Sequence, residues 1–431
     1  MTANGREASA HEEPSLYAPI GVVDLELSQP LVAIQGCARF TSMRALVRID
    51  GHPIGWLYFG TRGPSIPVAH VRWALVAQLG DAVQQHERSL LAAAGTPAGG
   101  TLPAISVVVC TRDRSDSLQR ALASLLALDY PAFEIIVVDN APATAETESL
   151  LAVLRASDSG AHERLRYVRE LRPGLDWARN RGLAEARHEI VAYTDDDVRV
   201  DRRWLQVLGR AFHDVEVQLV TGLVVPAELE SDAQVIFEDW YGGMGKGTRA
   251  RVFYPDFMDA RERLGAHHVG VGANMALRRG WLQQLGGFDT ALDVGTPSHG
   301  AGDLDIFHRT LAANGVARYE PAAIVRHYHR TDMRALRRQL RDNGRAFGVF
   351  LLSRWVRHER PRGPVARYAL GTWLRWMLAR IPRRFRKLER LPLRLQLEEW
   401  IGMLQSPWAW RATMASDRRV RSAFGGDDPP P

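Results

Sequence analysis

The sequence contains very little cysteine. Its 431 residues include two cysteines, Cys37 and Cys110. Two thiols cannot build the disulfide framework of a small secreted protein or a cysteine-rich zinc module, so both classes are excluded. Cys110 ends an apolar run, and we expect it to be a buried, unreactive thiol.

Long hydrophobic stretches are also missing. No apolar run approaches the roughly 18–20 residues that cross a bilayer as a helix. The best candidate, residues 364–379, is interrupted by Arg367 and Arg375. Residues 1–14 are polar and lack the apolar core of a signal peptide. We therefore expect a cytoplasmic protein without a membrane span.

Acidic residues are scarce in one part of the chain. The whole sequence has 55 Lys and Arg against 49 Asp and Glu, a formal net charge of +6. Residues 326–396 hold 20 basic and 4 acidic residues, so this segment is strongly basic and the remainder is acidic. Nucleic acid, anionic lipid or a phosphorylated substrate would each suit such a segment.

The remaining sequence divides into regions of different texture. The predicted order is a disordered N-terminus (1–16), a small α+β accessory domain (17–95), a linker (96–103), an α/β domain (104–332), a basic helical region (333–424) and a disordered tail (425–431). In the accessory domain, Asp50 and Gly51 predict a hairpin turn, and a helix is expected at 68–94. Residues 231–267 are expected to be irregular, with a mobile glycine-rich loop at 242–247.

Strands and helices alternate in the first half of the α/β domain. Apolar runs, typical of strands buried on both faces, predict strands at 105–110 and 133–139, and further strands are predicted at 165–169 and 189–194. Amphipathic stretches predict helices at 115–127, 145–156 and 175–187. This alternation specifies a mainly parallel sheet with right-handed crossovers. Such sheets bind ligands at the carboxyl ends of their strands.

Polar residues follow the predicted strand ends. Thr111 and Asp113 follow the first strand, Asp139 ends the second, and three aspartates at 195–197 follow the fourth. Further along, residues 300–309 read Gly-Ala-Gly-Asp-Leu-Asp-Ile-Phe-His-Arg. Because the carboxyl ends of parallel strands share one edge of a sheet, the first three groups are expected at a common rim.

Together these motifs resemble those of family 2 glycosyltransferases, over residues 104–328. The resemblance implies a GT-A type domain with a mostly parallel central sheet, preceded by the small α+β domain and followed by the basic helices. It also implies transfer of a sugar from a UDP-, GDP- or dTDP-sugar to an acceptor hydroxyl, with inversion, in the synthesis of a cell-surface polysaccharide or glycolipid.

The acidic triplet suggests a metal site. Adjacent carboxylates on an apolar strand repel one another and are costly to bury, and a hard divalent cation relieves that cost. The resemblance equates Asp195 and Asp197 with the D-x-D signature of the family. It implies that both bind Mg²⁺ or Mn²⁺ together with His327. An isolated triplet would more often be a solvated loop that caps a helix.

The resemblance also implies a donor-nucleotide site. Its expected residues are Thr111, Asp113, Asp139, Arg179, Asp195 and Asp196. Asp139 would accept a hydrogen bond from the base or ribose, and Arg179 would reach the diphosphate as a planar fork. The alternatives are a turn residue at Asp139 and a surface arginine at Arg179.

Asp303 falls on the catalytic aspartate of the family motif G-E-D-x-D. There it would take the proton of the acceptor hydroxyl as that oxygen attacks the anomeric carbon. The sequence departs from the motif at Gly302, where many members carry glutamate. Asp305 could replace Asp303 or cap the helix. The resemblance assigns Gly272, Asn274 and Asp305 to the acceptor and sugar.

Two other functions stay open. A nucleotidyltransferase acting on sugar phosphates would use a similar acidic rim, but residues 110–115 lack the glycines of its usual phosphate loop. A non-enzymatic protein could bind nucleic acid or membrane through the basic segment. That segment has no recognised nucleic-acid-binding motif, and we expect no nucleic acid.

The basic segment has features of an interfacial helix. Residues 371–381 combine aromatic, aliphatic and basic side chains. We therefore also expect peripheral contact with an anionic membrane at the inner face of the plasma membrane. There the protein would meet a saccharide or lipid-linked acceptor.

Overall fold

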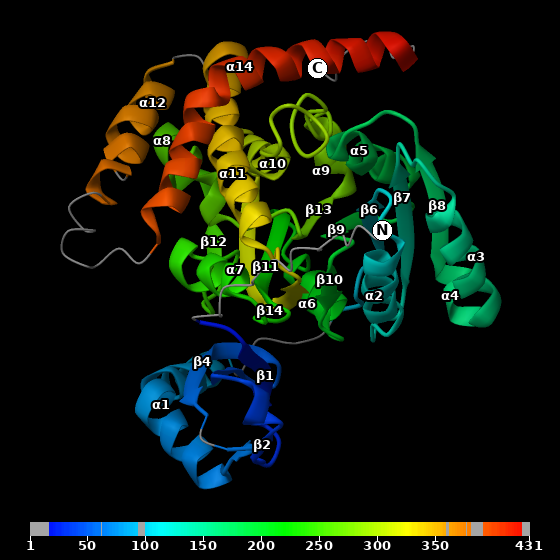
Figure 1. Cartoon of the computed structure of the whole chain (residues 1–431). Coiled ribbons are helices and arrows are strands. Elements are labelled where there is room, and N and C mark those ends of the chain that lie inside the picture. Colours follow the sequence, from blue (N-terminus) through cyan, green and yellow to red (C-terminus); the bar gives the residue numbers. More distant parts are fainter. Residues whose placement is uncertain are drawn as a thin grey trace, which may run out of the picture.

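The structure is a computed structural model that describes residues 17–61, 63–93, 100–358, 362–375, 377–380 and 391–424. A small N-terminal domain lies below a central α/β domain, and long C-terminal helices lie beside and above that domain (Figure 1). The predicted disordered ends, 1–16 and 425–431, and the first four residues of the predicted linker lie outside the described residues.

The N-terminal domain is a three-stranded sheet packed against one helix. The sheet order is β1 (Ile20–Glu26), β3 (Ser42–Ile49) and β4 (His52–Gly60), and α1 (Val68–Ala93) packs on β4. β2 (Ile34–Gln35) pairs with β5 (Ser65–Ile66), and η1 (Cys37–Arg39) lies between them. The predicted hairpin is confirmed, with positive φ at Asp50 (48°) and Gly51 (78°), as a tight hairpin turn requires.

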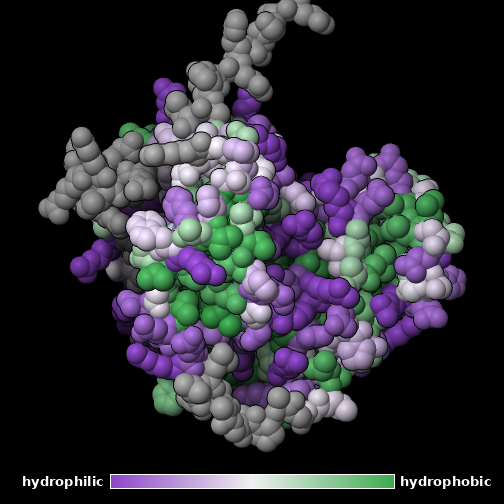
Figure 2. Space-filling view, turned by 90° about the horizontal axis from the view of Figure 1, so that it is seen from below, coloured by the Kyte–Doolittle hydropathy of each residue, from purple (hydrophilic) through white to green (hydrophobic). Residues whose placement is uncertain are grey.

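The surface on the side of the N-terminal domain is mixed. Seen from below, hydrophobic residues gather in separate areas that hydrophilic residues surround (Figure 2). Trp73 and Val76, both on α1, are among the exposed large apolar side chains of this domain.

The central domain contains a nine-stranded sheet with the order β10-β14-β11-β13-β9-β6-β7-β8, and β12 pairs with β14. The strands are β6 (Ile105–Thr111), β7 (Phe133–Asn140), β8 (Leu165–Glu170), β9 (Ile190–Asp195), β10 (Val198–Val200), β11 (Val217–Pro226), β12 (Arg251–Phe253), β13 (Asn274–Arg278) and β14 (Val316–His327). β6, β7, β8 and β9 pair in parallel, as do β11 and β14. The four strands predicted in residues 105–194 are confirmed.

Helices cover both faces of this sheet. They are α2 (Ser115–Leu126), α3 (Glu146–Ser157), α4 (Ser159–Arg164), α5 (Leu175–Glu185), α6 (Trp204–Ala211), α9 (Arg279–Gln284) and α10 (Gly302–Ala312). Alternate residues of one strand point to opposite faces. Val107 and Val109 of β6 belong to one apolar cluster with residues of α2 and α6, whereas Val108 belongs to another with residues of α5 and α10. Burial raises the pKa of the Cys110 thiol at the end of β6, although this side chain is only partly buried.

Short elements fill the segment that was predicted to be irregular. They are α7 (Asp232–Val235), the π-helical turn η2 (Ile236–Tyr241), β12, the 3-10 turns η3 (Pro255–Phe257) and η4 (Ala266–His268), and α8 (Ala260–Arg263). Ser231 and Asp259 start α7 and α8 with capping boxes. The prediction of a wholly irregular segment was therefore wrong.

The C-terminal region is helical, as expected. It contains α11 (Met333–Ser353), η5 (Arg354–His358), α12 (Gly363–Ala366), η6 (Arg367–Leu374) and α14 (Leu393–Phe424). α14 first runs beside α11 and then bends across the top of the central domain (Figure 1). Pro407 lies inside α14, and an internal proline commonly kinks a helix. No described helix is both long and apolar enough to cross a membrane.

Candidate active site

The strand ends of the central sheet bring the predicted site residues to one edge. In the sheet register, Thr111 of β6 lies opposite Asp139 of β7, and Cys110 lies opposite Asp195 of β9. His327 ends β14, opposite Val198, the residue after the acidic triplet. The rim expected from the sequence is therefore present.

Asp195, Asp197 and His327 form a compact group at this rim. Each offers one ligand atom, and these atoms lie within 4.8 Å of one another. His327 Nε2 lies 3.2 Å from Asp197 Oδ1. Burial, together with the charge of Asp197, raises the pKa of Asp195 to about 6. A divalent cation would relieve the cost of burying these carboxylates, so the group fits a metal.

Arg114 supplies positive charge to the same rim. Its Nη1 donates to Asp196 Oδ1 (2.7 Å) and its Nη2 donates to Asp197 Oδ2 (2.8 Å). Burial opposes ionisation of Asp197, but His327 and Arg114 outweigh it and lower the pKa of this carboxyl. Burial disfavours the charged form of His327 as well, but Asp197 and Asp195 raise its pKa. Arg114 was not among the predicted site residues, because an arginine in a turn forms a surface ion pair about as readily as a ligand contact.

Thr111 and Asp196 bind each other. The Thr111 hydroxyl donates to Asp196 Oδ2 (2.7 Å), and the other oxygen of Asp196 accepts from Arg114. Burial raises the pKa of Asp196 to about 6 despite these contacts. Both side chains were assigned to the donor nucleotide, and in this structure they position the rim itself.

Asp139 has a buried oxygen with no partner among the described residues. Its Oδ2 accepts from the Tyr167 hydroxyl (3.1 Å), whereas Oδ1 is buried and makes no hydrogen bond. Burial raises the pKa of this carboxyl. Nearby, Asp113 has a positive φ of 50°, and its Oδ1 accepts from the Ala143 amide (2.9 Å). The unused oxygen of Asp139 suits an N–H donor from a ligand.

Arg179 is held by two carboxylates. Its Nη1 donates to Asp176 Oδ1 (2.9 Å) and to Asp293 Oδ2 (2.5 Å), and the residue is only 5% exposed. It is therefore not the surface arginine that the sequence left open. Asp176 and Asp293 were not predicted, because neither belongs to a motif and they lie 117 positions apart.

The same two carboxylates occupy the space beside Gly302. A Cβ on Gly302 would lie 2.2 Å from Asp176 Oδ2 and 2.5 Å from Asp293 Oδ2. At the position where many family members carry glutamate, this chain thus has no side chain and two neighbouring carboxylates. Burial and the charge of Asp293 raise the pKa of Asp176 well above its usual value. Asp176 Oδ2 also has no partner among the described residues.

Asp303 lies in the first turn of α10 and faces a cavity. Its Oδ2 accepts from the Gly272 amide (2.9 Å), and its Oδ1 accepts from the Leu304 amide (2.8 Å). Burial, followed by the charge of Asp293, raises the pKa of this carboxyl. A Cβ on Gly272 would lie 2.9 Å from Arg179 Nη2 and 3.1 Å from Asp303 Cβ. Gly272 therefore gives Arg179 and Asp303 room to approach each other.

The structure corrects the assignment of Asn274. Its side chain is fully buried, and its Oδ1 accepts from Trp204 Nε1 (2.9 Å). Its Nδ2 donates to the carbonyl oxygens of Leu223 (3.1 Å) and Ala323 (2.8 Å). With all of these groups engaged in the core, Asn274 has nothing left to offer a sugar hydroxyl.

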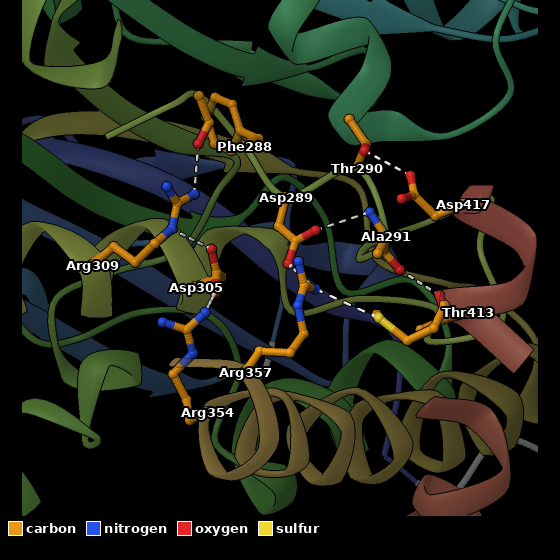
Figure 3. Close-up of polar contacts among 12 residues, drawn as sticks. Phe288, Asp289, Thr290, Ala291, Asp305, Arg309, Arg354, Arg357, Thr413 and Asp417 are labelled. Atoms are coloured by element: carbon orange, nitrogen blue, oxygen red, sulfur yellow. Dashed lines mark hydrogen bonds and ion pairs between the residues drawn. The ribbon is translucent and has the colours of Figure 1, made fainter. Parts of the chain in front are cut away.

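The structure also corrects the assignment of Asp305. This carboxylate is fully buried between Arg309 Nε (2.6 Å) and Arg354 Nη2 (2.5 Å) (Figure 3). Two guanidinium groups satisfy both oxygens, so Asp305 neither replaces Asp303 as a base nor contacts the acceptor. It joins α10 to the C-terminal helices.

The loop that carries Asp293 is anchored from the C-terminal region. Arg357 Nη1 donates to Asp289 Oδ2 (2.8 Å), and the Thr290 hydroxyl donates to Asp417 Oδ1 (2.7 Å) (Figure 3). The Thr413 hydroxyl donates to the carbonyl oxygen of Ala291. α14 therefore helps to fix the loop whose Asp293 holds Arg179.

One large cavity connects these residues to the C-terminal helices. Its volume is about 1280 Å³, and Asp195, Arg179, Asp293 and Asp303 line it. Thr111, Asp113, Asp139, Asp196, Asp197 and His327 belong to the neighbouring rim and do not line it. The aromatic residues that line it are Phe237, Tyr241, Phe253, Tyr254, Phe257, Phe347 and Tyr368.

Several basic side chains of this cavity were not predicted from the sequence, among them Lys246 and His267. Lys246 lies in the glycine-rich loop at 242–247, and His267 lies in η4. Burial lowers the pKa of both, that of His267 to about 3, and the Nδ1 of His267 is buried without a partner among the described residues. The glycines at 242–247 predicted a loop, but the sequence of this loop did not indicate that Lys246 faces the cavity.

Comparison with known proteins identifies the class. Residues 106–286 match the family described as glycosyl transferase family 2, a segment that begins in β6 and ends just after α9. This segment of the chain is therefore similar to family 2 glycosyltransferases. The fold class expected from the sequence is confirmed, with a central mostly parallel sheet of GT-A type, a small preceding domain and a helical C-terminal region.

Several characterised proteins resemble this chain. The pre-mycofactocin glycosyltransferase of Mycobacterium tuberculosis is 29% identical over 246 residues, which cover 55% of this chain and 45% of that protein. The glucosyl-dolichyl phosphate glucuronosyltransferase of Haloferax volcanii is 23% identical over 193 residues, 43% of this chain and 56% of that protein. The chain thus spans about half the length of these relatives.

A solved structure shows a weaker likeness. It is the mannosyltransferase PcManGT from Pyrobaculum calidifontis in complex with GDP-Man and Mn²⁺, with 18% identity and a TM-score of 0.45. The alignment covers 81% of this chain and 85% of that one.

Proposed function

We propose that the protein transfers a sugar, as a hexosyltransferase does, from a nucleotide-diphosphate donor to an acceptor hydroxyl with inversion. One observation carries this proposal: Asp195, at the end of β9, and Asp303, at the start of α10, line a single cavity with Arg179. A carboxylate suited to the cation of the donor thus shares a space with a carboxylate suited to accept the acceptor's proton.

The cation would be Mg²⁺ or Mn²⁺, held by Asp195, Asp197 and His327. Hard divalent cations prefer oxygen ligands, and Mn²⁺ also accepts an imidazole nitrogen. A bound cation supplies positive charge that stabilises the departing nucleoside diphosphate. Arg114, which already pairs with Asp197, lies beside this group and adds a fixed positive charge.

Asp303 would act as the general base. It accepts the proton of the acceptor hydroxyl while the hydroxyl oxygen forms a bond to the anomeric carbon and the bond to the phosphate oxygen breaks. The raised pKa of this carboxyl suits proton transfer. A retaining reaction needs a second, nucleophilic carboxylate. Asp176 and Asp293 both bind Arg179, which supports a single displacement with inversion.

The rim beside the cavity would hold the nucleoside. Asp139 Oδ1, buried and unpaired among the described residues, can accept a hydrogen bond from the base. Uracil, guanine and thymine all carry a suitable ring N–H, so the UDP-, GDP- and dTDP-sugars are the donors to test. Asp113 borders the same turn, after β6.

The acceptor would enter from the side of the C-terminal helices. There the cavity is rich in aromatic residues, including Tyr254, Phe257, Phe347 and Tyr368. Aromatic walls favour an acceptor with an apolar part, such as a lipid-linked saccharide, over a plain polysaccharide. We place the protein as a peripheral enzyme at the inner face of the plasma membrane, in glycolipid or cell-surface polysaccharide synthesis.

A donor screen tests the proposal. Nucleotide-sugars would be incubated with Mg²⁺ or Mn²⁺ and lipid-linked acceptors, and nucleoside diphosphate release and product anomers would be measured. We expect release from one donor, an inverted product, and loss of activity with EDTA or in Asp197→Ala, while Asp116→Asn, an exposed carboxylate on α2, stays active. Pyrophosphate release from a sugar phosphate and a nucleoside triphosphate would instead show a nucleotidyltransferase.

A further inference from the structure

Helix α14 carries five large apolar side chains on the outside, while its inner face combines Leu395 with smaller and charged residues. The outer residues, with their exposed fractions, are Leu393 (45%), Leu397 (40%), Ile401 (39%), Leu404 (72%) and Trp408 (69%). The buried ones include Glu398, Gly402, Ser406, Ala409 and Thr413. A helix on a water-facing surface shows the opposite arrangement.

The five outer residues form a continuous row, called here the α14 stripe. They follow one another at intervals of four, four, three and four residues, which places them on one side of a helix. At about 1.5 Å per residue the part of the row before Pro407, from Leu393 to Leu404, is about 16 Å long, and Trp408 follows the proline. Scattered apolar residues on a surface need no explanation, whereas a contiguous apolar patch marks an interaction site.

The inner face of α14 leaves no room for these side chains. A Cβ on Gly402 would lie 1.8 Å from the carbonyl oxygen of Arg341 in α11. A Cβ on Gly344 of α11 would lie 2.0 Å from the carbonyl oxygen of Glu399. Because the two backbones touch, α14 cannot rotate to bury the α14 stripe. The stripe is therefore fixed outward.

The charges of α14 are also sorted between its faces. Arg394, Arg411, Arg418 and Arg419 are exposed. The acidic residues of the helix point inward: Glu398 accepts from Arg337 Nε (3.0 Å) and Arg341 Nε (2.7 Å). Glu399 pairs with Arg380, and Asp417 accepts from Thr290. The outer face thus combines apolar and positive side chains, because the acidic residues of this helix lie on its inner face.

A second apolar row lies on the neighbouring segment. Leu370 (66%), Leu374 (37%) and Leu378 (52%) are exposed at intervals of four residues. This segment is tied to α14 because Arg380 Nη1 lies 3.1 Å from Glu399 Oε2. An interfacial helix was predicted from the sequence at residues 371–381. The α14 stripe is a second, longer apolar row beside that segment.

We propose that the α14 stripe docks on an anionic lipid bilayer, together with the row at 370–378. Apolar residues bordered by arginines match the acyl region and the anionic headgroups of a membrane interface. A second copy packed on the stripe by twofold symmetry would bring the arginines of both copies together. Nucleic acid would leave the apolar side chains without a partner. No described helix can span a membrane, so the helix lies on the surface.

This surface adjoins the far end of the cavity. Tyr368 and Thr372, from the segment of the second row, and Glu399 of α14 line the cavity on faces other than the exposed rows. A bilayer on the α14 stripe would therefore lie beside the aromatic part of the cavity. The membrane proposal rests on the peripheral location given with the proposed function, but docking requires neither donor nor metal, so a failure of docking can be told apart from a failure of sugar transfer.

Vesicle flotation tests the proposal. The full chain, without donor or metal, would be floated with phosphatidylcholine vesicles or with vesicles that also contain phosphatidylglycerol. We expect flotation with the anionic vesicles, little with the neutral ones, and release at high salt. The double variant Leu404→Ser/Trp408→Ser should bind at least about tenfold more weakly, because it removes two of the most exposed apolar anchors.

The matched control is Val153→Ser, which removes an equally exposed apolar side chain (65%) from α3. It should float like the unaltered protein, and both variants should keep its thermal unfolding midpoint. Equal flotation of the double variant, or no flotation of the unaltered protein, would overturn the proposal. A dimer in light scattering that the double variant converts to a monomer would also overturn it, in favour of a second copy.

Discussion

Two aspartates in the first turn of α10 lie in different environments. Asp303 lines the cavity and accepts from two backbone amides, whereas Asp305 is buried between two guanidinium groups. The variant Asp303→Asn should fold and bind donor normally, because the amide keeps the shape of the carboxyl group and its oxygen can still accept one of the two backbone hydrogen bonds. It should lose transfer by about 10²–10⁴-fold, the usual contribution of a general base. Initial rates with saturating donor measure this loss.

The control for this prediction is Asp305→Asn. It should lower the thermal unfolding midpoint, because it removes the charge that Arg309 and Arg354 share. Retention of full transfer by Asp303→Asn, or a stable but inactive Asp305→Asn, would show that the base is not Asp303.

Gly302 is expected to tolerate no side chain. The added Cβ of Gly302→Ala would meet the carboxylates of Asp176 and Asp293 at 2.2 and 2.5 Å, so the two groups that hold Arg179 must move. We expect a fall in transfer of at least about tenfold, because small displacements in an active site are costly. Gly280→Ala is the control, since its Cβ would meet no atom within 4 Å. Equal rates in the two variants would contradict the prediction.

Motifs predicted only part of the site at the residue scale. The acidic triplet and Asp303 could be found because their spacing is local in the sequence. Asp293 could not, since it reaches Arg179 across 114 positions through a loop without regular structure. Asn274 was assigned wrongly because its burial is set by Trp204, 70 positions away, and no local pattern reveals that contact.

At the scale of elements, local pattern predicted the strands that are apolar throughout. All eight residues of β7 are buried, and the apolar run at 135–138 forms its centre. β13 and α10 were not predicted as elements, since their sequences were interpreted as ligand motifs. The outward stripe of α14 could not be predicted either, because the close contact of α11 and α14 decides which side faces out.

Arg354 joins two elements through a buried ion pair. It is 2% exposed and donates to Asp305, so η5 is tied to α10 (Figure 3). Arg354→Leu should lower the free energy of unfolding by about 3–5 kcal/mol, because it leaves part of a buried charge uncompensated. Chemical denaturation followed by circular dichroism measures this change.

An exposed ion pair provides the comparison. Arg39 donates to Glu230, and the two side chains are 68% and 35% exposed. Arg39→Leu should change the free energy of unfolding by less than about 1 kcal/mol. If Arg354→Leu and Arg39→Leu lowered the free energy of unfolding by similar amounts, the buried pair would stabilise the protein no more than the exposed one.

At the scale of the whole molecule, the N-terminal domain is docked on the central domain through one face of β3. Ala45 and Val47 belong to the domain's own core, whereas Leu46, between them, packs with Leu223 and Tyr319 of the central domain. Ion pairs surround this contact: Arg44 with Asp239, Arg48 with Asp201, and Arg326 with Asp24. The sequence predicted the small domain, but not its docking, because no pattern specifies which distant strand Leu46 meets.

The docking contact also reaches the cavity. The Tyr319 hydroxyl donates to the carbonyl oxygen of Gly247 (2.6 Å), and the adjacent Lys246 lines the cavity. Leu46 therefore supports a tyrosine that holds the glycine-rich loop. Loss of this support should affect the acceptor side of the cavity more than the metal rim, because Asp195 ends β9 and His327 lies at the end of β14 away from Tyr319.

Leu46→Asp tests this connection. A buried carboxylate between the domains is costly, so the N-terminal domain should separate while its own core stays intact. We expect a larger radius of gyration in small-angle scattering, a second unfolding transition, and a several-fold higher KM for acceptor with unchanged donor binding. Val32→Asp, which changes a 66% exposed residue of the same domain, should leave all three unchanged. If Leu46→Asp kept the radius of gyration and a single unfolding transition, the ion pairs rather than Leu46 would hold the two domains together.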